Sequence, residues 1–218
     1  MNSRDIVLSR IRRALADVPR EKGPEETPVP RDYWQRHAAR NDTQRIELLA
    51  ENLTDYRAVV HLCTSAELPG VIAGLLRHRG ARRVVAPWAV PDGWLPDDVE
   101  RLADSAEQSP RELDAVDSVV TGCAVAVAET GTIVLDAGED QGRRRISLVP
   151  DHHICVVHAP SQVVDSVPQA LSRLDPTRPQ TWISGPSATS DIELDRVEGV
   201  HGPRSLDVVI TSPGASAS

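Results

Sequence analysis

Hydroxyl-bearing residues and glycine gather in one stretch near the C-terminus, at positions 184–191. The candidate ligand-binding residues of this stretch are Ser184, Gly185, Ser187, Thr189, Ser190 and Asp191. The stretch follows a strand-like run, and we expect it to enter a short helix whose free backbone N–H groups bind a carboxylate or a phosphate. We expect it at the ligand crevice usual in α/β sheets, outside the carboxyl ends of the strands. An ordinary Ser/Thr helix cap, with Asp191 strengthening the first turn, is the alternative interpretation.

A glycine-rich loop separates this stretch from the last strand-like run. Its candidate ligand-binding residues are Gly199, His201, Gly202 and Arg204. Glycine lets the backbone approach a ligand closely, and an arginine binds a carboxylate through two parallel hydrogen bonds. A tight connection that needs glycine for backbone reasons alone explains the same pattern equally well.

Glu129 is the candidate for covalent or acid–base chemistry. It lies in Glu129-Thr130-Gly131, between two apolar, β-rich runs of residues 116–136, where the chain must bend. A carboxylate at such a corner can attack an acyl group or act as a base. Together with the 184–191 stretch, it would make the chain a stand-alone transferase or ligase acting on a CoA thioester, phosphosugar or folate-type ligand. A corner with a solvated acid is the interpretation we favour.

The charged loop at residues 138–145 precedes two adjacent histidines, His152 and His153. Its arginines, Arg143–Arg145, would cover a pocket or dock a partner, although a charged loop is more often only solvated. Strand alternation sends His152 and His153 to opposite faces, so the pair is a poor metal site, and we expect no metal in this chain.

Composition narrows the function classes. The formal net charge of −8 makes nucleic acid a poor first partner. No run approaches the ~18 apolar residues that a membrane span needs, so we expect a cytoplasmic protein. Cys63, Cys123 and Cys155 each lie in an apolar run, which is typical of buried thiols rather than disulfides.

Hydropathy patterning predicts an α/β protein with an N-terminal helical arm. We expect an amphipathic helix at 2–17, a Pro-rich loop ending near residue 30, one domain at 31–212 and a frayed tail at 213–218. Within the domain, helices are expected at 33–53, 66–78, 97–108 and 163–174, and strands at 56–63, 82–88, 146–158, 180–185 and 205–211, besides the two runs of 116–136. Such alternation favours an open, mainly parallel sheet with helices on both faces.

Three ordered segments carry a family resemblance. TGCAVAVAETGTIVL (121–135), VPDHHICVV (149–157) and SGPSATSDIELDRVEGVHGPRSLDVVI (184–210) are similar to successive blocks of the LUD (lactate utilization) domain, over roughly residues 45–212. The resemblance implies a fold of the NagB/RpiA/CoA-transferase type, related to 5-formyltetrahydrofolate cyclo-ligase. Glu129 is similar in position to the nucleophilic glutamate of CoA-transferases.

The same resemblance implies a role with two iron–sulfur partner proteins in oxidising L-lactate to pyruvate. The sequence holds no C-x₂-C run for a cluster and no G-x-G-x-x-G turn of Rossmann type, so we expect no cofactor in this chain. A non-catalytic protein that binds a small anionic metabolite is the third interpretation. The sequence leaves the oligomeric state open, and a homo-oligomer is one of the partners considered.

Overall fold

The computed structural model describes residues 3–17, 30, 32–189, 197–198 and 201–213, with the backbone alone at 188–189 and 197–198. The chain divides into two compact units, Met1–Tyr33 and Trp34–Ser218. In the first unit, α1 (Ser3–Ala14) forms where the amphipathic helix is predicted. Most of the predicted Pro-rich loop and of the 213–218 tail lies outside the described residues.

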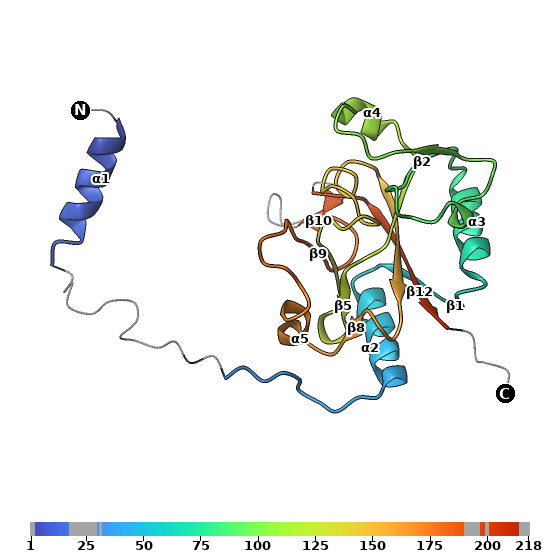
Figure 1. The fold of residues 1–218 in the computed structure, drawn as a ribbon, viewed down its shortest axis with the longest axis horizontal. Coiled ribbons are helices and arrows are strands. Elements are labelled where there is room, and N and C mark those ends of the chain that lie inside the picture. The colour runs from blue at the N-terminus through green and yellow to red at the C-terminus, as the bar shows by residue number, and fades with distance from the viewer. Residues whose placement is uncertain (1–2, 18–29, 31, 190–196, 199–200, 214–218) are drawn as a thin grey trace. The chain divides into compact units, whose positions relative to one another are not determined.

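A sheet of six parallel strands forms the centre of the second unit (Figure 1). In spatial order the strands are β1 (Val59–Thr64), β12 (Ser205–Ser212), β7 (His152–His158), β4 (Ser118–Thr121), β2 (Arg83–Val85) and β3 (Glu100–Leu102). A parallel strand in the middle of such a sheet is buried on both faces, so its sequence is continuously apolar. This is why the runs of β7 and β12 were recognisable, and the predicted α/β class is confirmed.

The two faces of this sheet are covered by different helices (Figure 1). On one face, α3 (Leu68–Arg79) buries Ile72 and Leu76 in the same cluster as Ile154 and Val209. On the other face, α2 (Asp42–Asp55) buries Leu49 and Leu53 in the cluster that contains Val157 and Val208. Alternate residues of β7 and β12 thus supply two separate cores.

A second sheet packs on the α2 side. Its four strands, in order, are β8 (Val163–Val164), β5 (Val125–Val127), β6 (Thr132–Leu135) and β9 (Thr181–Ile183). Ala126 and Ile133 join the α2 core, while Val125 and Val134 face a smaller core with α5 (Val167–Leu171). The bend predicted at residues 129–131 is present as the 3₁₀ turn η3 (Ala128–Thr130) between the antiparallel strands β5 and β6.

The helix predicted at 33–53 begins later than expected. Asn41 caps α2: its side chain accepts the backbone N–H of Gln44 at 2.9 Å, and the Gln44 side chain accepts the N–H of Asn41 at 3.0 Å. This reciprocal capping box stops helical hydrogen bonding at Asn41. Residues 34–41 therefore lie outside the helix, as a non-helical segment that we term the strap.

Three further predicted elements were wrong in extent or type. The helix expected at 97–108 is absent: these residues form turns and irregular chain around the short edge strand β3, and α4 (Pro110–Asp114) starts only after its N-cap, Ser109. Residues 146–151 form turns before β7, although Ile146 is buried against Val85 and Leu113. The helix expected from 163 is the short strand β8 followed by α5, which has a proline in its first turn. Pairing and burial outweighed local propensity at these sites.

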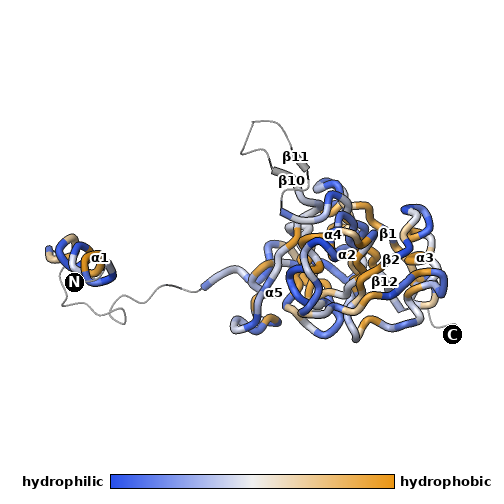
Figure 2. The backbone as a smooth tube through the Cα atoms, turned by 90° about the horizontal axis from the view of Figure 1, so that it is seen from above, coloured by the Kyte–Doolittle hydropathy of each residue, from blue (hydrophilic) through white to orange (hydrophobic). Residues whose placement is uncertain are grey.

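The remaining elements are short. They are η2 (Asp92–Trp94), β10 (Ala188–Thr189) and β11 (Val197–Glu198), the last two forming an antiparallel pair. Figure 2 shows hydrophobic residues concentrated along the central strands and hydrophilic residues on much of the surrounding loop and helix surface. Within the described residues, every helix is too short or too polar to cross a bilayer.

Candidate ligand-binding site

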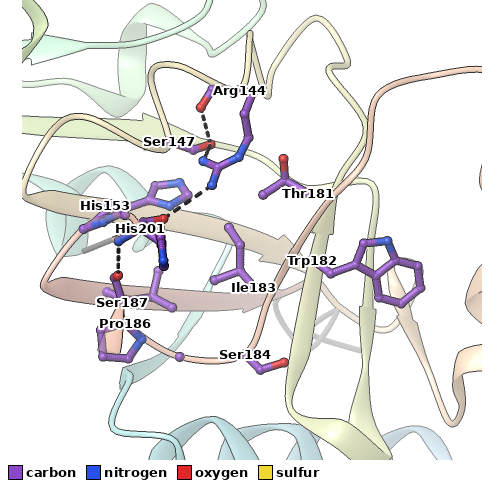
Figure 3. A pocket seen from close by; sticks show the side chains of 14 residues that line it. Arg144, Ser147, His153, Thr181, Trp182, Ile183, Ser184, Pro186, Ser187 and His201 are labelled. Atoms are coloured by element: carbon purple, nitrogen blue, oxygen red, sulfur yellow. Dashed lines mark hydrogen bonds between the residues drawn. The ribbon is translucent and has the colours of Figure 1, made fainter. Parts of the chain in front are cut away.

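A cavity of about 210 Å³ lies between the six-stranded sheet and β9 of the second sheet. We term it the inter-sheet cavity. Its polar lining comprises Arg144, Ser147, His153, Thr181, Ser184, Ser187 and His201. Apolar side chains of Ile183, Pro186, Pro203 and Leu206, with Trp182, Gly185 and Gly202, complete the lining. Figure 3 labels Trp182, Ile183 and Pro186 among them.

The cavity does not occupy the position usual for α/β ligand sites. His153 and Leu206 are the second residues of β7 and β12, so the cavity meets the amino-terminal ends of these parallel strands. The expected crevice at the carboxyl ends is therefore wrong for this cavity. The physical reason is the second sheet, which brings β9 and the residues after it against the opposite end.

The structure brings together half of the predicted ligand-binding residues. Ser184, Gly185, Ser187, His201 and Gly202 all line the inter-sheet cavity. The side chain of Thr189, together with Ser190, Asp191 and Gly199, lies outside the described residues. The short helix predicted for the 184–191 stretch does not begin within residues 184–189, because residues 184–186 bend and residues 188–189 form β10; residues 190 and 191 lie outside the described residues. A helix N-terminus thus gives the described part of this site none of its donors.

Two hydrogen bonds join the 184–187 bend to the loop before β12. The backbone N–H of Ser187 donates to the carbonyl of Pro203 at 2.8 Å, and its Oγ accepts the N–H of His201 at 3.0 Å. Gly185 has a φ of 87°, and a Cβ there would lie 2.3 Å from the carbonyl oxygen of Tyr56. This position requires glycine, so at residue 185 the backbone explanation is sufficient.

The arginine that lines the cavity is Arg144 rather than Arg204. Arg204 donates to Asp151 at 2.6 and 3.1 Å and does not line the cavity. Arg144 makes two long hydrogen bonds, 3.4 Å to Ser147 Oγ and 3.4 Å to the carbonyl of His201 (Figure 3). Arg144 is an exposed residue; partial desolvation of its guanidinium lowers the pKa of Arg144, but arginine stays charged at neutral pH. The sequence offered only the run of three arginines as a signal for this residue.

His152 and His153 have different partners, as strand alternation predicts. The Nε2 of His153 is hydrogen-bonded to Thr121 Oγ1 at 2.7 Å. Burial, with smaller effects from His152 and Arg144, lowers the pKa of His153 to about 3, so the imidazole beside the cavity is neutral. Within the described residues, no set of three His, Cys, Asp or Glu side chains is arranged to hold a metal ion.

His152 belongs to a hydrogen-bonded row across four neighbouring strands. Its Nδ1 is 2.7 Å from Ser118 Oγ and its Nε2 is 2.8 Å from Asp207, which also contacts His61 at 2.7 Å. Burial raises the pKa of Asp207, but the hydrogen bonds from His152 and His61 lower it more, so the net shift is downward. Ser118 is fully buried, and this row therefore stabilises the sheet rather than presenting a nucleophile.

Glu129 sits at the predicted corner but is not solvated, so that part of the favoured interpretation was wrong. Its carboxylate is 2.9 Å from Arg40 Nη1 and 2.8 Å from His37 Nδ1, and only 15% of its side chain is exposed. Burial raises the pKa of Glu129, but the hydrogen bonds from His37 and Arg40 lower it below its ordinary value. Glu129 lines a separate open hollow with Asn52 and Thr130. A nucleophilic role would first require the strap to release this carboxylate.

Comparison with known proteins identifies the family. The sequence model of the LUD domain matches residues 46–211. The chain belongs to the LUD domain family. A relative from Deinococcus radiodurans named lactate utilization protein C is 45% identical, over 94% of this chain and 93% of its own length. Another protein of that name, from an Exiguobacterium species, is 31% identical over 84% of this chain and 87% of its own length.

A crystal structure of a DUF162 family protein from Deinococcus radiodurans has the same fold. Its sequence is 39% identical, the TM-score is 0.67, and the match covers 79% of this chain and 99% of that one. The three segments that resemble LUD blocks meet in space: Thr121 supports His153, and the 184–210 block supplies Ser187 and Leu206. Arg144 lies outside all three LUD-like segments, which is why the resemblance did not indicate it.

Proposed function

We propose that this LUD protein is an accessory, non-redox component of a cytoplasmic system that oxidises L-lactate to pyruvate with two iron–sulfur partner proteins. The observation that carries the proposal is its likeness, along nearly the whole chain, to a protein named lactate utilization protein C. The family match over residues 46–211 supports it.

The cysteines of the chain are consistent with an accessory component that carries no iron–sulfur cluster of its own. A four-thiolate cluster needs four cysteines, and the sequence contains three. All three are free; Cys123 and Cys155 are buried in the α2 core, while Cys63 packs against the α3 core. The hydrogen bond to Cys155 and burial raise the pKa of the Cys123 thiol, which opposes ligation by its thiolate. We therefore assign the electron-carrying clusters to the partners.

The proposal is tested by recovering the protein from cells grown on L-lactate. The tagged chain is captured anaerobically, and the eluate is assayed for co-purifying proteins, iron and lactate-dependent dye reduction. The same chain produced alone is the control. We expect iron-containing partners and activity to arrive together, while the chain alone reduces no dye.

Two results would contradict this function. Recovery of the chain from lactate-grown cells without iron-containing partners would refute the proposed assembly. Full lactate-dependent dye reduction by the purified chain alone would refute the accessory role, because the chain would then be the oxidising enzyme itself.

A further inference from the structure

The inter-sheet cavity has one permanently charged side chain among the described residues that line it. That side chain is Arg144. The neighbouring arginines are engaged elsewhere: Arg143 binds the carboxylate of Asp104 at 2.6 and 3.0 Å, and Arg145 donates to the carbonyl of Ala106 at 3.1 Å. Arg144 contacts only neutral oxygens, at 3.4 Å, and no carboxylate of the described residues pairs with it. Its guanidinium is thus available to an anion.

Two neutral groups can complete the recognition of such an anion. Ser187 Oγ accepts a backbone N–H of His201, so its own hydroxyl proton remains for a ligand oxygen. His153 is neutral, and its Nε2 is held by Thr121; with the Thr121 hydroxyl donating to Nε2, the proton is on Nδ1, and the ring can donate a hydrogen bond without a second positive charge. One cation flanked by neutral donors is balanced by a single negative charge rather than by the two of a phosphate.

The size and the remaining wall define the ligand further. A volume of about 210 Å³ corresponds to roughly seven water-sized volumes. The cavity is partly open to solvent, so this space accommodates a ligand of about six or seven non-hydrogen atoms but sets no upper limit on its size. Ile183, Pro203 and Leu206 form an apolar wall of the cavity, which a carbon chain can contact and an inorganic anion cannot use.

We propose that the inter-sheet cavity binds a small 2-hydroxy or 2-oxo monocarboxylate. The carboxylate pairs with Arg144, the 2-oxygen bonds to Ser187, and the carbon chain contacts Leu206 and its apolar neighbours. The choice of L-lactate and pyruvate as probes rests on the proposed function. The site itself is argued from the charge, donors and volume of this chain.

Calorimetric titration of the full chain tests the site directly. The probes are sodium L-lactate, pyruvate and inorganic phosphate at one ionic strength. We expect saturable binding of L-lactate or pyruvate, and much weaker binding of phosphate. Arg144→Gln should weaken carboxylate binding about ten- to hundredfold, because it removes a charge-assisted contact. Arg145→Gln is the matched control, because it differs from Arg144→Gln only in which arginine is lost. It should bind the carboxylates as tightly as the wild type does.

Three outcomes overturn the inference. The first is a dissociation constant above about 10 mM for both carboxylates with the folded wild type. The second is an affinity for phosphate that equals or exceeds the affinity for the carboxylates. The third is an equal loss of carboxylate affinity in Arg144→Gln and Arg145→Gln. Circular dichroism of each variant confirms that its fold is retained, and Arg144→Lys, which keeps the charge, should retain part of the affinity. Recovery of iron-containing partners by an Arg144→Gln chain, together with failed titrations of the wild type, refutes this inference alone. Titrations that succeed without partner recovery refute only the proposed function.

Discussion

At the scale of single residues, Arg204 and Arg144 differ in whether a carboxylate neutralises them. Arg204 follows a Gly-Pro turn in a family-like block, and Arg144 lies in a charged loop. What separates them is Asp151, which pairs with Arg204 and leaves Arg144 as the cavity's cation. A sequence shows that an arginine is present but not which carboxylate neutralises it. Ser187 and His201 were predictable because their own segment carries the signal.

The buried, neutral His153 should make folding stability depend on pH. Its pKa is about 3 in the folded chain and about 6.5 when unfolded. Between these values the unfolded chain binds more protons, so the free energy of unfolding falls as pH decreases, by up to ~1.4 kcal/mol per pH unit from this group. Urea denaturation at several pH values from neutral to about 5 should show that His153→Gln loses this part of the slope.

The exposed His78 provides the control for that measurement. His78→Gln should keep the acid sensitivity of the wild type. An unchanged slope in His153→Gln would mean that the imidazole protonates in the folded state without cost, and that it is not neutral beside the cavity.

At the scale of elements, periodicity located the main helices and strands but not their ends. The apolar spacing of Leu49 and Leu53 indicates a helix, whereas its start depends on a reciprocal bond between Asn41 and Gln44. Residues 97–108 were predicted to be a helix because Asp97 and Asp98 suit its first turn, whereas the following Glu100 and Arg101 also suit the edge of a sheet. Pairing partners distant in sequence decide such cases.

The capping box of α2 should contribute measurably to stability. Asn41→Ala removes the acceptor for the N–H of Gln44 and should lower the free energy of unfolding by ~1 kcal/mol. Asn41→Asp keeps an acceptor and should stay close to the wild type. Equilibrium urea unfolding of the three chains measures both differences. An equal loss in the two variants would place the effect outside the cap.

The bend after β9 should tolerate only glycine at residue 185. Gly185→Ala forces a side chain into a positive-φ position 2.3 Å from the Tyr56 carbonyl oxygen, and it should cost ~1–3 kcal/mol of stability. Gly70→Ala in α3 is the matched substitution, because a Cβ there has no neighbour within 4 Å. It should be neutral or stabilising by up to ~1 kcal/mol. Thermal unfolding of both variants provides the comparison, and equal melting temperatures would refute the steric argument.

At the scale of the molecule, the parallel sheet was predictable and the second sheet was not. The runs of β5 and β6 resemble those of any buried strand, and nothing local shows that they leave the main sheet. That departure creates the inter-sheet cavity, because it places Ile183 and Ser187 opposite His153 and Leu206. The site therefore depends on how the two sheets pack together. The sequence pattern indicates the individual strands but not this packing.

The strap attaches the chain before α2 to the second sheet through a small set of polar contacts. Arg40 contacts Glu129 at 2.9 Å and Asp165 at 3.5 Å, and Ser166 Oγ contacts the carbonyl of Gln35. We expect Arg40→Gln to loosen the strap and to speed limited proteolysis within residues 34–41 by about fivefold or more, as local opening becomes more frequent. Mass spectrometry of the early cleavage products measures this rate.

Arg36, which is exposed in the same strap and has no ion-pair partner among the described residues, is the matched position. Arg36→Gln should leave the rate of cleavage unchanged. Because the hydrogen bonds from His37 and Arg40 lower the pKa of Glu129, its charge and the contact persist at neutral pH and are lost only as pH falls through that lowered pKa, below the ordinary range of a glutamate. Glu129→Gln should therefore speed cleavage at pH 7 and converge with the wild type in acid. Cleavage that is equally slow in Arg40→Gln and in the wild type would contradict this expectation and show that the Arg40 contacts do not hold the strap in place.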